Sequence, residues 1–417
     1  MSTPRTPRDI QAVSQGRFAA LRVRNFRIFF IGQFISVIGN WMQIVAFSAL
    51  VLDRLHRGGT VLGLVTATLY LPVLALGPLG GVVADRFDKR RLVIATQITF
   101  ALTVGTLGLL VLTDTLALWS LLLLASTQGA INAFDNPARQ TFVHEMVGAE
   151  LLTNAVGLNM LAMNTGRVIG PAIAGVLLAT TDLGTLFVLN SVSFLGAIIA
   201  LIAIRRDQLQ PSVRIAAEPG QIRAGWRYVR GEPTIRTTLL MLAVVGGLSY
   251  NFPVVLPLLA KQTFHMPKEQ YGALFSLMGV GAMVFALARS PRTAPTNRRL
   301  TIGTTGLGVA LVALALAPTK LVAYFVLPFV GMGSINFLVL MNSSLQLAST
   351  AAMRGRVMAL YTMALLGTTP FGALLVGWIG ENVGARSATA LGGVAAIVAA
   401  QWAQARFTRQ ATAKPVL

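Results

Sequence analysis

The stretch GGVVADRFDKRR, Gly80 to Arg91, joins two apolar runs of the chain, near 60–84 and 91–112. Each run is long enough to cross the roughly 30 Å hydrocarbon core of a bilayer. Such runs recur from end to end. Of the 417 residues, 54% are hydrophobic and 12% are charged, where a soluble domain carries about 25% charged residues. The mean hydropathy is +0.69. The sequence therefore predicts an all-α polytopic membrane protein.

Apolar runs bounded by charges or by Gly/Pro clusters predict twelve transmembrane helices. We place them near 26–52, 60–84, 91–112, 115–138, 152–180, 183–204, 236–260, 270–289, 300–317, 321–345, 356–379 and 387–405. The longest polar interruption separates the sixth run from the seventh. The expected organisation is a cytoplasmic N-terminal arm (1–25), an N-terminal six-helix half (26–204), a cytoplasmic linker (205–235), a C-terminal six-helix half (236–405) and a cytoplasmic tail (406–417).

A weak internal repeat supports two related halves. A shift of 202 residues lays residues 153–159 on residues 355–361, which places Asn159 on Tyr361. It also aligns two pairs of glycines, Gly170 with Gly372 and Gly175 with Gly377. These residues lie in the fifth and eleventh predicted helices, which correspond if the two halves are parallel repeats, as in many secondary transporters.

The distribution of charge predicts the orientation of the chain. The sequence has 34 Lys and Arg against 14 Asp and Glu, a net charge of +20, which in a soluble protein would suggest a nucleic-acid partner. Here 27 of the 34 basic residues lie in the two ends and in the loops after even-numbered helices, and six lie in the other loops. Since cytoplasmic loops carry the excess of Lys and Arg, we expect cytoplasmic termini, a multi-pass protein of the cell (inner or plasma) membrane, and no nucleic-acid partner.

The loop after the second predicted helix resembles the GxxxDRxxRR-like signature of the major facilitator superfamily. The matching residues are Gly81, Asp85, Arg86, Lys89 and Arg90, with Arg91 directly after them. On physical grounds Gly81 would allow close packing of its helix, and Asp85 would accept hydrogen bonds at a helix N-terminus. The basic cluster would bind acidic groups across the cytoplasmic face and act as a gate. The alternative is an ordinary basic cytoplasmic loop. Asp88 stands where the family usually has a second Gly.

A second signature lies in the fifth predicted helix, GLNMLAMNTGRVIGPAIAG. Its glycines and proline resemble the helix 5 element of the drug:proton antiporters of that superfamily; they are Gly157, Gly166, Gly170, Pro171 and Gly175. Small residues let two helices pack closely, and a proline bends a helix. The alternative is generic packing of small residues. Ala174 departs from the family pattern.

Two further segments, GNWMQ (39–43) and FDNPARQTFVHEMV (134–147), are similar to the branch that includes the enterobactin exporter and macrolide-efflux proteins. The resemblance covers nearly the whole chain. It implies the major facilitator fold, with twelve transmembrane helices in two six-helix halves, and proton-driven export of a small amphiphilic molecule such as a drug, an antibiotic or a siderophore.

Two ionisable residues fall clearly inside predicted spans, Asp135 and Arg167. Each costs about 2.5–3.5 kcal/mol at a helix centre and is usually functional. They are candidates for proton coupling: they lie on consecutive antiparallel helices, and we expect either that they pair or that Asp135 meets the basic cluster of 86–91. A purely structural ion pair is an equal alternative. His144 and Glu145 are expected in a loop.

Uncharged polar residues form stripes at helical spacing on five predicted helices, and amides facing lipid would be costly. We therefore expect these stripes to line a central cavity. The candidate substrate-cavity residues are Gln33, Ser36, Asn40, Gln43, Gln128, Asn132, Asn159, Asn164, Tyr250, Asn251, Asn336, Ser343 and Tyr361.

Other function classes are disfavoured. The sequence contains no GxxxxGK[ST], HExxH or GxSxG motif, so an ATPase or an intramembrane hydrolase is not expected. There is no Cys, and the three His are scattered, so neither a metal nor a cofactor is expected. The expected partners are the lipid bilayer, a small-molecule substrate and protons, and the protein is expected to act as a monomer. The alternatives are a facilitator or uptake carrier of the same fold and, less favoured, a membrane receptor or scaffold.

Overall fold

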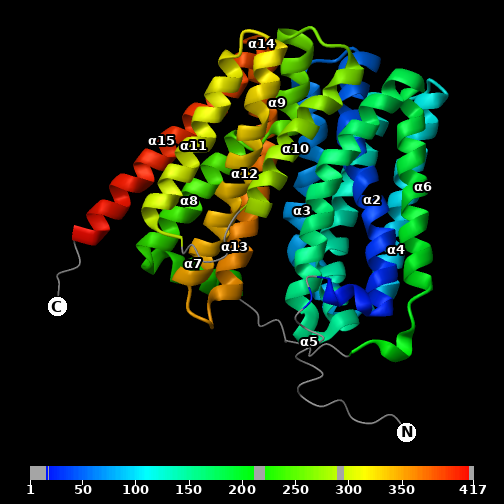
Figure 1. Cartoon of the computed structure of the whole chain (residues 1–417), viewed down its shortest axis with the longest axis horizontal. Helices are drawn as coiled ribbons and strands as arrows, with labels where there is room; N and C mark the ends of the chain where they lie inside the picture. Colours follow the sequence, from blue (N-terminus) through cyan, green and yellow to red (C-terminus); the bar gives the residue numbers. More distant parts are fainter. Residues whose placement is uncertain (1–15, 17, 211–220, 289–294, 413–417) are drawn as a thin grey trace.

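The chain folds into a bundle of long helices whose axes are roughly aligned (Figure 1). The computed structural model describes residues 16, 18–210, 221–288 and 295–412. The longer helices among these residues are α2 (Arg24–Ala49), α3 (Gly59–Arg86), α4 (Lys89–Leu112), α5 (Leu118–Thr180), α6 (Leu183–Ile202), α7 (Gln221–Gly231), α8 (Pro233–Leu248), α9 (Phe252–Leu258), α10 (Tyr271–Ala288), α11 (Asn297–Leu316), α12 (Lys320–Ala348), α13 (Arg354–Leu366), α14 (Thr369–Asn382) and α15 (Ala385–Thr412).

The apolar runs that predict transmembrane helices are helical over most of their length. Five-residue π-helical turns, η2 (Leu50–Arg54) and η4 (Leu259–Thr263), extend α2 and α9, and short 3-10 helices lie at Ala19–Arg22 (η1), Arg206–Gln208 (η3) and Lys268–Gln270 (η5). Two of the runs are interrupted: α8 is separated from α9, and α13 from α14. In the part of the chain that the structure describes, eleven helical segments are long and apolar enough to cross a membrane, when α8 and α9 are counted as one segment and α13 and α14 as another.

One of these segments, α5, is 63 residues long and covers two of the predicted helices and the loop expected between them. The prediction that His144 and Glu145 lie in a loop is therefore wrong. The helix continues because residues 142, 143, 146 and 147 are apolar and pack into a core cluster. Gly148 interrupts α5, with a φ of 72°. This conformation suits glycine, which has no Cβ to clash, so Gly148 joins two helices without a loop.

The helices form two groups that lie side by side (Figure 1). Helices α2 to α6, the N-terminal helix group, pack against one another, and helices α8 to α15, the C-terminal helix group, do the same. The principal contacts between the groups are α3 with α14 and α5 with α10. The short helix α7 follows the N-terminal group and packs on α13, where Gly225 lies against Arg356.

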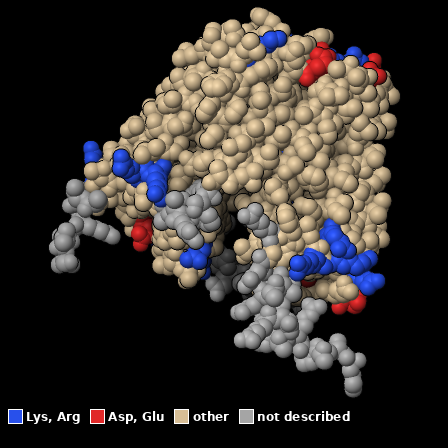
Figure 2. All heavy atoms as spheres, viewed as in Figure 1, with Lys and Arg blue, Asp and Glu red and all other residues tan. Residues whose placement is uncertain are grey.

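The two groups touch at one end and part at the other. A Cβ added to Gly59 would lie 2.5 Å from the Gly377 carbonyl oxygen, and one added to Gly63 would overlap the Ala373 carbonyl. Gly81 is 18 residues beyond Gly63, five full turns of helix, and therefore lies on the same face of α3. Nothing lies within 4 Å of a Cβ added at Gly81. The surface is hollowed between the groups at this lower end, where most of the visible basic side chains lie (Figure 2).

The glycines aligned by the internal repeat occupy equivalent places in the two groups. Gly170 packs on α2, against the Ile38 carbonyl oxygen, and Gly372 packs on α8, against Gly247; each contact lies within one group. The second aligned pair makes contacts across the two groups: Gly175 lies near Glu269, and Gly377 lies against Gly59.

Some of the predicted segments lie outside the described residues. These are most of the N-terminal arm, the centre of the linker (211–220) and the end of the tail (413–417). The basic residues Arg5, Arg8, Arg17, Arg214 and Lys414 fall in such segments, and Arg289 and Arg292 fall in a further one, 289–294.

Candidate functional site

The predicted gate motif forms the tight turn between α3 and α4. Asp88 is the N-cap of α4, and its carboxylate accepts a hydrogen bond of 2.7 Å from the backbone N–H of Arg91. Asp85, which is expected to serve a helix N-terminus, lies in the last turn of α3 and is exposed, and its role stays a prediction. Asp88, the departure from the family pattern, therefore closes the turn by capping a helix.

The basic residues of this motif fasten the loop to its own helix group. Lys89 forms an ion pair of 3.2 Å with Glu145 of α5. The Arg90 side chain donates hydrogen bonds of 2.7 Å to the carbonyl oxygens of Leu201 and Ile202. These carbonyls are at the C-terminus of α6, where a cation is favoured by the helix dipole. Lys89 thus binds an acidic side chain, as expected of the basic cluster, whereas Arg90 binds main-chain carbonyl oxygens.

The close helix contact expected of Gly81 is made by Gly80. A Cβ at Gly80 would overlap the Ala133 carbonyl of α5, while the space beside Gly81 is open. The expectation for Gly81 is therefore wrong in this conformation. Its neighbour packs within the N-terminal helix group, and Gly81 faces the region where the two groups separate.

The glycine-rich signature of α5 packs closely over most of its length. Gly166 lies against Val37, and Gly170 against the Ile38 carbonyl, both on α2. On the next turns α5 meets the C-terminal helix group: the Pro171 carbonyl lies against Gly272 of α10. Gly157 is the exception, because nothing lies within 4 Å of a Cβ at that position. Close packing is thus absent at Gly157, at the end of the helix where the groups part.

Asp135 is fully buried, with no exposed surface, and its partners lie within the N-terminal helix group. It pairs with Arg139, one turn further along α5, and accepts hydrogen bonds from the side chains of Thr96 (2.7 Å) and Gln97 (3.1 Å) on α4. The structure brings Asp135 to neither of its expected partners, Arg167 or the basic cluster of 86–91. Arg139, one turn along α5 from Asp135, forms the ion pair instead.

Arg167 lies instead among aromatic residues. Its guanidinium stacks over the ring of Trp41 on α2, 4.8 Å from the ring centre. Tyr70 of α3 and Tyr250, between α8 and α9, are the groups whose electrostatic interaction with Arg167 is largest. Its Nε atom is buried without a hydrogen-bond partner. Among the described residues, no carboxylate oxygen lies within 4.0 Å of the Arg167 guanidinium, so Arg167 forms no ion pair there.

Several candidate cavity residues are buried in contacts between helices. Gln43 of α2 donates a 2.7 Å hydrogen bond to Gln128 of α5 and accepts one from Asn190 of α6. Ser36 donates to the Ser193 carbonyl. Asn251 bonds the Gly247 carbonyl at 2.5 Å. The expectation that these stripes line a cavity is wrong for the following residues, which are buried: Gln33, Ser36, Gln43, Gln128 and Asn251. The amides of Gln43, Gln128 and Asn190 thus bond to one another, as buried polar groups usually do, although Gln128 Nε2 and Asn251 Oδ1 have no partner among the described residues.

The other candidates are at least partly accessible. They are Asn40, Asn132, Asn159, Asn164, Tyr250, Asn336, Ser343 and Tyr361. Tyr250 donates a hydrogen bond to the Ser334 carbonyl of α12 and packs against Phe337, with 5.8 Å between ring centres. Tyr361 bonds Asn342 of the same group. Asn336 lies beside Gly303 of α11.

Sequence reasoning missed three residues of this region, Tyr70, Asn190 and Asn342. Trp41 was part of a recognised segment but received no role. A single tyrosine or asparagine in an apolar helix gives no periodic signal, so spacing alone could not have found these residues. The useful signal would have been Arg167 itself, since a cation in a span requires partners.

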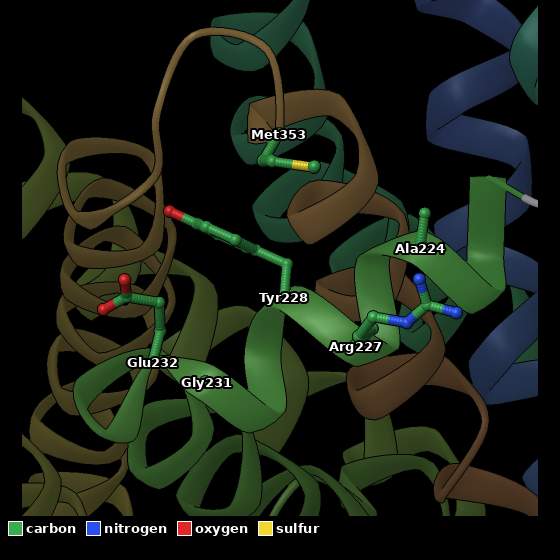
Figure 3. Close-up of a pocket in the computed structure, with 6 residues that line it drawn as sticks. All are labelled: Ala224, Arg227, Tyr228, Gly231, Glu232 and Met353. Atoms are coloured by element: carbon green, nitrogen blue, oxygen red, sulfur yellow. The ribbon is translucent and has the colours of Figure 1, made fainter.

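A shallow pocket lies beside α7, away from these residues (Figure 3). Its volume is about 320 Å³, and its lining residues are Ala224, Arg227, Tyr228, Gly231, Glu232 and Met353. The Tyr228 side chain reaches toward the turn before α13, where its hydroxyl accepts a hydrogen bond of 3.4 Å from the Thr350 backbone. The pocket is thus a feature of the attachment of α7 to α13 and does not lie between the two helix groups.

Comparisons with known proteins agree with this architecture. A family model described as transmembrane secretion effector, of the MFS type, matches residues 15–414. The enterobactin exporter EntS of Citrobacter koseri is 28% identical over 363 residues, which are 85% of each chain. The staphyloferrin A transporter of Staphylococcus aureus is 26% identical over 265 residues, 63% of this chain and 66% of that protein.

The fold is similar to that of a solved transporter. A bacterial homologue of the human lysosomal transporter Spinster, in an inward-facing and unoccupied conformation, has a TM-score of 0.72 and 14% sequence identity, with 92% of this chain and 96% of that chain covered. At this identity the likeness concerns the fold alone.

Proposed function

Because the chain belongs to the transmembrane secretion effector family of the major facilitator superfamily, we propose that it is a secondary active exporter that moves a small amphiphilic molecule out of the cell by alternating access. The observation that carries the proposal is the divergence of α3 from the C-terminal helix group. The groups are in close contact at Gly63 and apart at Gly81 on the same helix face. A carrier that opens to one side at a time requires such an arrangement.

The proposed topology has twelve spans and cytoplasmic termini. Gly148 divides α5 into two spans, so the eleven segments long enough to cross a membrane give twelve proposed spans. The domain boundaries expected from the sequence then correspond to two six-helix halves, the N-terminal and C-terminal helix groups, joined by a linker that contains α7. The excess of Lys and Arg at the open end supports a cytoplasmic location for that end and a cell-membrane location for the protein. In this conformation the carrier is open to the cytoplasm.

The substrate class is proposed from the relatives. Two of them are named for siderophores, enterobactin and staphyloferrin A. We therefore place siderophore-like molecules first, and other amphiphiles such as antibiotics second. Candidate contacts are the accessible polar residues between the groups, including Asn159 and Tyr250. The protein acts as a monomer in this proposal, since each chain carries both halves.

Proton coupling is proposed through Asp135. Its carboxylate is buried and lies at the junction of α4 and α5. Protonation would remove the charge that holds Arg139 and would loosen this junction. Arg167 stacks on Trp41 and does not pair with Asp135, which pairs with Arg139. We therefore propose that Arg167 affects coupling only through its position between the two helix groups.

The experiment is transport into everted membrane vesicles, whose lumen corresponds to the outside of the cell. A panel of catecholate siderophores, hydroxycarboxylate siderophores and macrolides is offered with the lumen acidified. The expected result is accumulation of at least one siderophore that collapses on addition of a protonophore. Vesicles without the protein provide the control. If no compound accumulates, export is contradicted. Accumulation that equilibrates and ignores the gradient would show a facilitator instead of an antiporter.

A further inference from the structure

Arg167 lies where the closed part of the molecule meets the open part. On α5, the backbone of Arg167 contacts Gly279 of α10, and the next turn contacts Gly272. In the other direction along α5, Gly157 borders open space. The guanidinium is therefore at the inner limit of the close contact between the two helix groups.

The charge of this guanidinium is not neutralised by the protein. Among the residues that the structure describes, Arg167 makes no ion pair, and its buried Nε has no acceptor. The nearby carboxylate that the sequence suggested, Asp135, is already occupied by Arg139, Thr96 and Gln97. A cation within a span is costly unless it is paired. The stack on Trp41 offsets only part of that cost.

The surrounding side chains suit one kind of ligand. Guanidinium groups hold planar oxyanions through paired N–H donors. Trp41 of the N-terminal helix group provides an aromatic face, which stacks on the guanidinium with 4.8 Å between the ring centre and the guanidinium carbon. An anionic oxygen group on a flat apolar body would satisfy the charge and pack on the ring at the same time.

We infer that Arg167, stacked on Trp41, recognises an anionic oxygen group, a carboxylate or a phenolate, on an aromatic or apolar substrate. This inference deepens the proposed function, on which it rests for the idea of a transported molecule. The substrate supplies the missing counter-ion, and because the backbone of Arg167 lies against Gly279 of the C-terminal helix group, its binding links the charge to the relative position of the groups.

The test is equilibrium binding to the purified protein in lipid nanodiscs, which does not depend on the direction or energy source of transport. The probes are 2-naphthoate and 2-naphthamide, which have the same ring system and differ in the charge of the substituent. We expect 2-naphthoate to bind about tenfold more tightly or better, the effect of one charge-assisted hydrogen-bonded contact. Arg167→Gln should abolish the preference and leave 2-naphthamide binding in place, while Arg167→Lys should keep part of the preference.

Binding of 2-naphthamide to Arg167→Gln also reports that this variant is folded. If the variant does not fold, Trp41→Ala replaces it; it removes the aromatic face and should weaken 2-naphthoate binding severalfold. Arg54→Gln is the charge-matched control, because it removes a cation at the outer end, where Arg54 pairs with Asp114, and should leave the preference unchanged. Equal binding of the two probes by the unmodified protein, or a preference that persists in Arg167→Gln, would overturn the inference. Failure of vesicle export alone would affect only the proposed function.

Discussion

Asp53 and Lys261 form an ion pair of 3.0 Å that joins the two helix groups at the end opposite the termini. Asp53 lies in η2, which extends α2 of the N-terminal helix group. Lys261 lies in η4, which extends α9 of the C-terminal helix group. Lys261 also donates a hydrogen bond to the Leu52 carbonyl. At the same end, the carboxylate of Glu381 on α14 accepts a hydrogen bond of 2.8 Å from the backbone N–H of Thr60. These contacts hold this end of the molecule closed in this conformation.

Lys261→Gln should shift the protein away from this conformation. The ion pair is partly exposed, so its loss should cost about 0.5–1 kcal/mol, a change of about two- to fivefold in the population. The measurement is the distance between spin labels at Arg57 and Asn382, which is simple to arrange because the chain has no native Cys. Lys320→Gln is the control, a basic residue at the same end without an ion pair among the described residues. Identical distance distributions for Lys261→Gln and Lys320→Gln would contradict this role.

Gly63→Ala and Gly81→Ala should change thermal stability in opposite directions. The new methyl group at position 63 would overlap the Ala373 carbonyl, while the one at position 81 meets open space. Alanine favours a helix over glycine by up to about 1 kcal/mol, so Gly81→Ala should raise the melting temperature in nanodiscs and Gly63→Ala should lower it. The two variants are matched controls for each other. A rise in both melting temperatures would mean that the outer contact is not close.

Removal of the Asp135 carboxylate should be more damaging than its neutralisation. Asp135→Ala leaves Arg139, Thr96 and Gln97 without their acceptor, and breaking such a buried pair costs about 3–5 kcal/mol. Asp135→Asn keeps an acceptor oxygen for Thr96 and Gln97 and should be much better tolerated. Thermal unfolding of the two variants checks this order. In vesicles, Asp135→Asn should lose gradient-driven accumulation, and intact accumulation would contradict the coupling role.

Gln43→Leu should destabilise the protein without changing the apparent affinity for substrate. Gln43 is the middle member of the buried amide chain with Gln128 and Asn190, and its loss leaves the Gln128 side-chain oxygen without its donor and the Asn190 side-chain N–H without its acceptor. An unsatisfied buried polar group costs about 1–3 kcal/mol. The melting temperature should fall, and KM for vesicle transport should stay within about twofold, since this chain lies between helices. A large rise in KM at an unchanged melting temperature would return Gln43 to the cavity.

Hydropathy and charge predicted the helical architecture well, because crossing a bilayer requires long apolar helices whatever their packing. The continuous helix through Glu145 was missed, since short polar segments near a membrane surface are read as loops from hydropathy alone. Gly148 shows that one residue with a positive φ can replace a loop.

The candidate site was predicted less completely. Spacing places Gln43 and Asn40 on one stripe of a helix, but it does not say whether a neighbouring helix covers that stripe. Asp135 and Arg167 were expected to pair because they lie on consecutive antiparallel helices, yet Arg139, one turn away on the same helix, pairs with Asp135. Which partner a buried side chain meets depends on how segments distant in sequence pack together. The spacing of residues along one sequence does not reveal that packing.

The most direct measurement of alternating access uses two pairs of spin labels in proteoliposomes. One pair, at Phe87 and Arg354, reports the open end between α3 and α13; the other, at Arg57 and Asn382, reports the closed end. All four positions are exposed. With a transported siderophore and an imposed pH gradient, the distance at the open end should shorten while that at the closed end lengthens, giving two exchanging populations. Fixed distances at both ends, in vesicles that transport the same compound, would contradict alternating access.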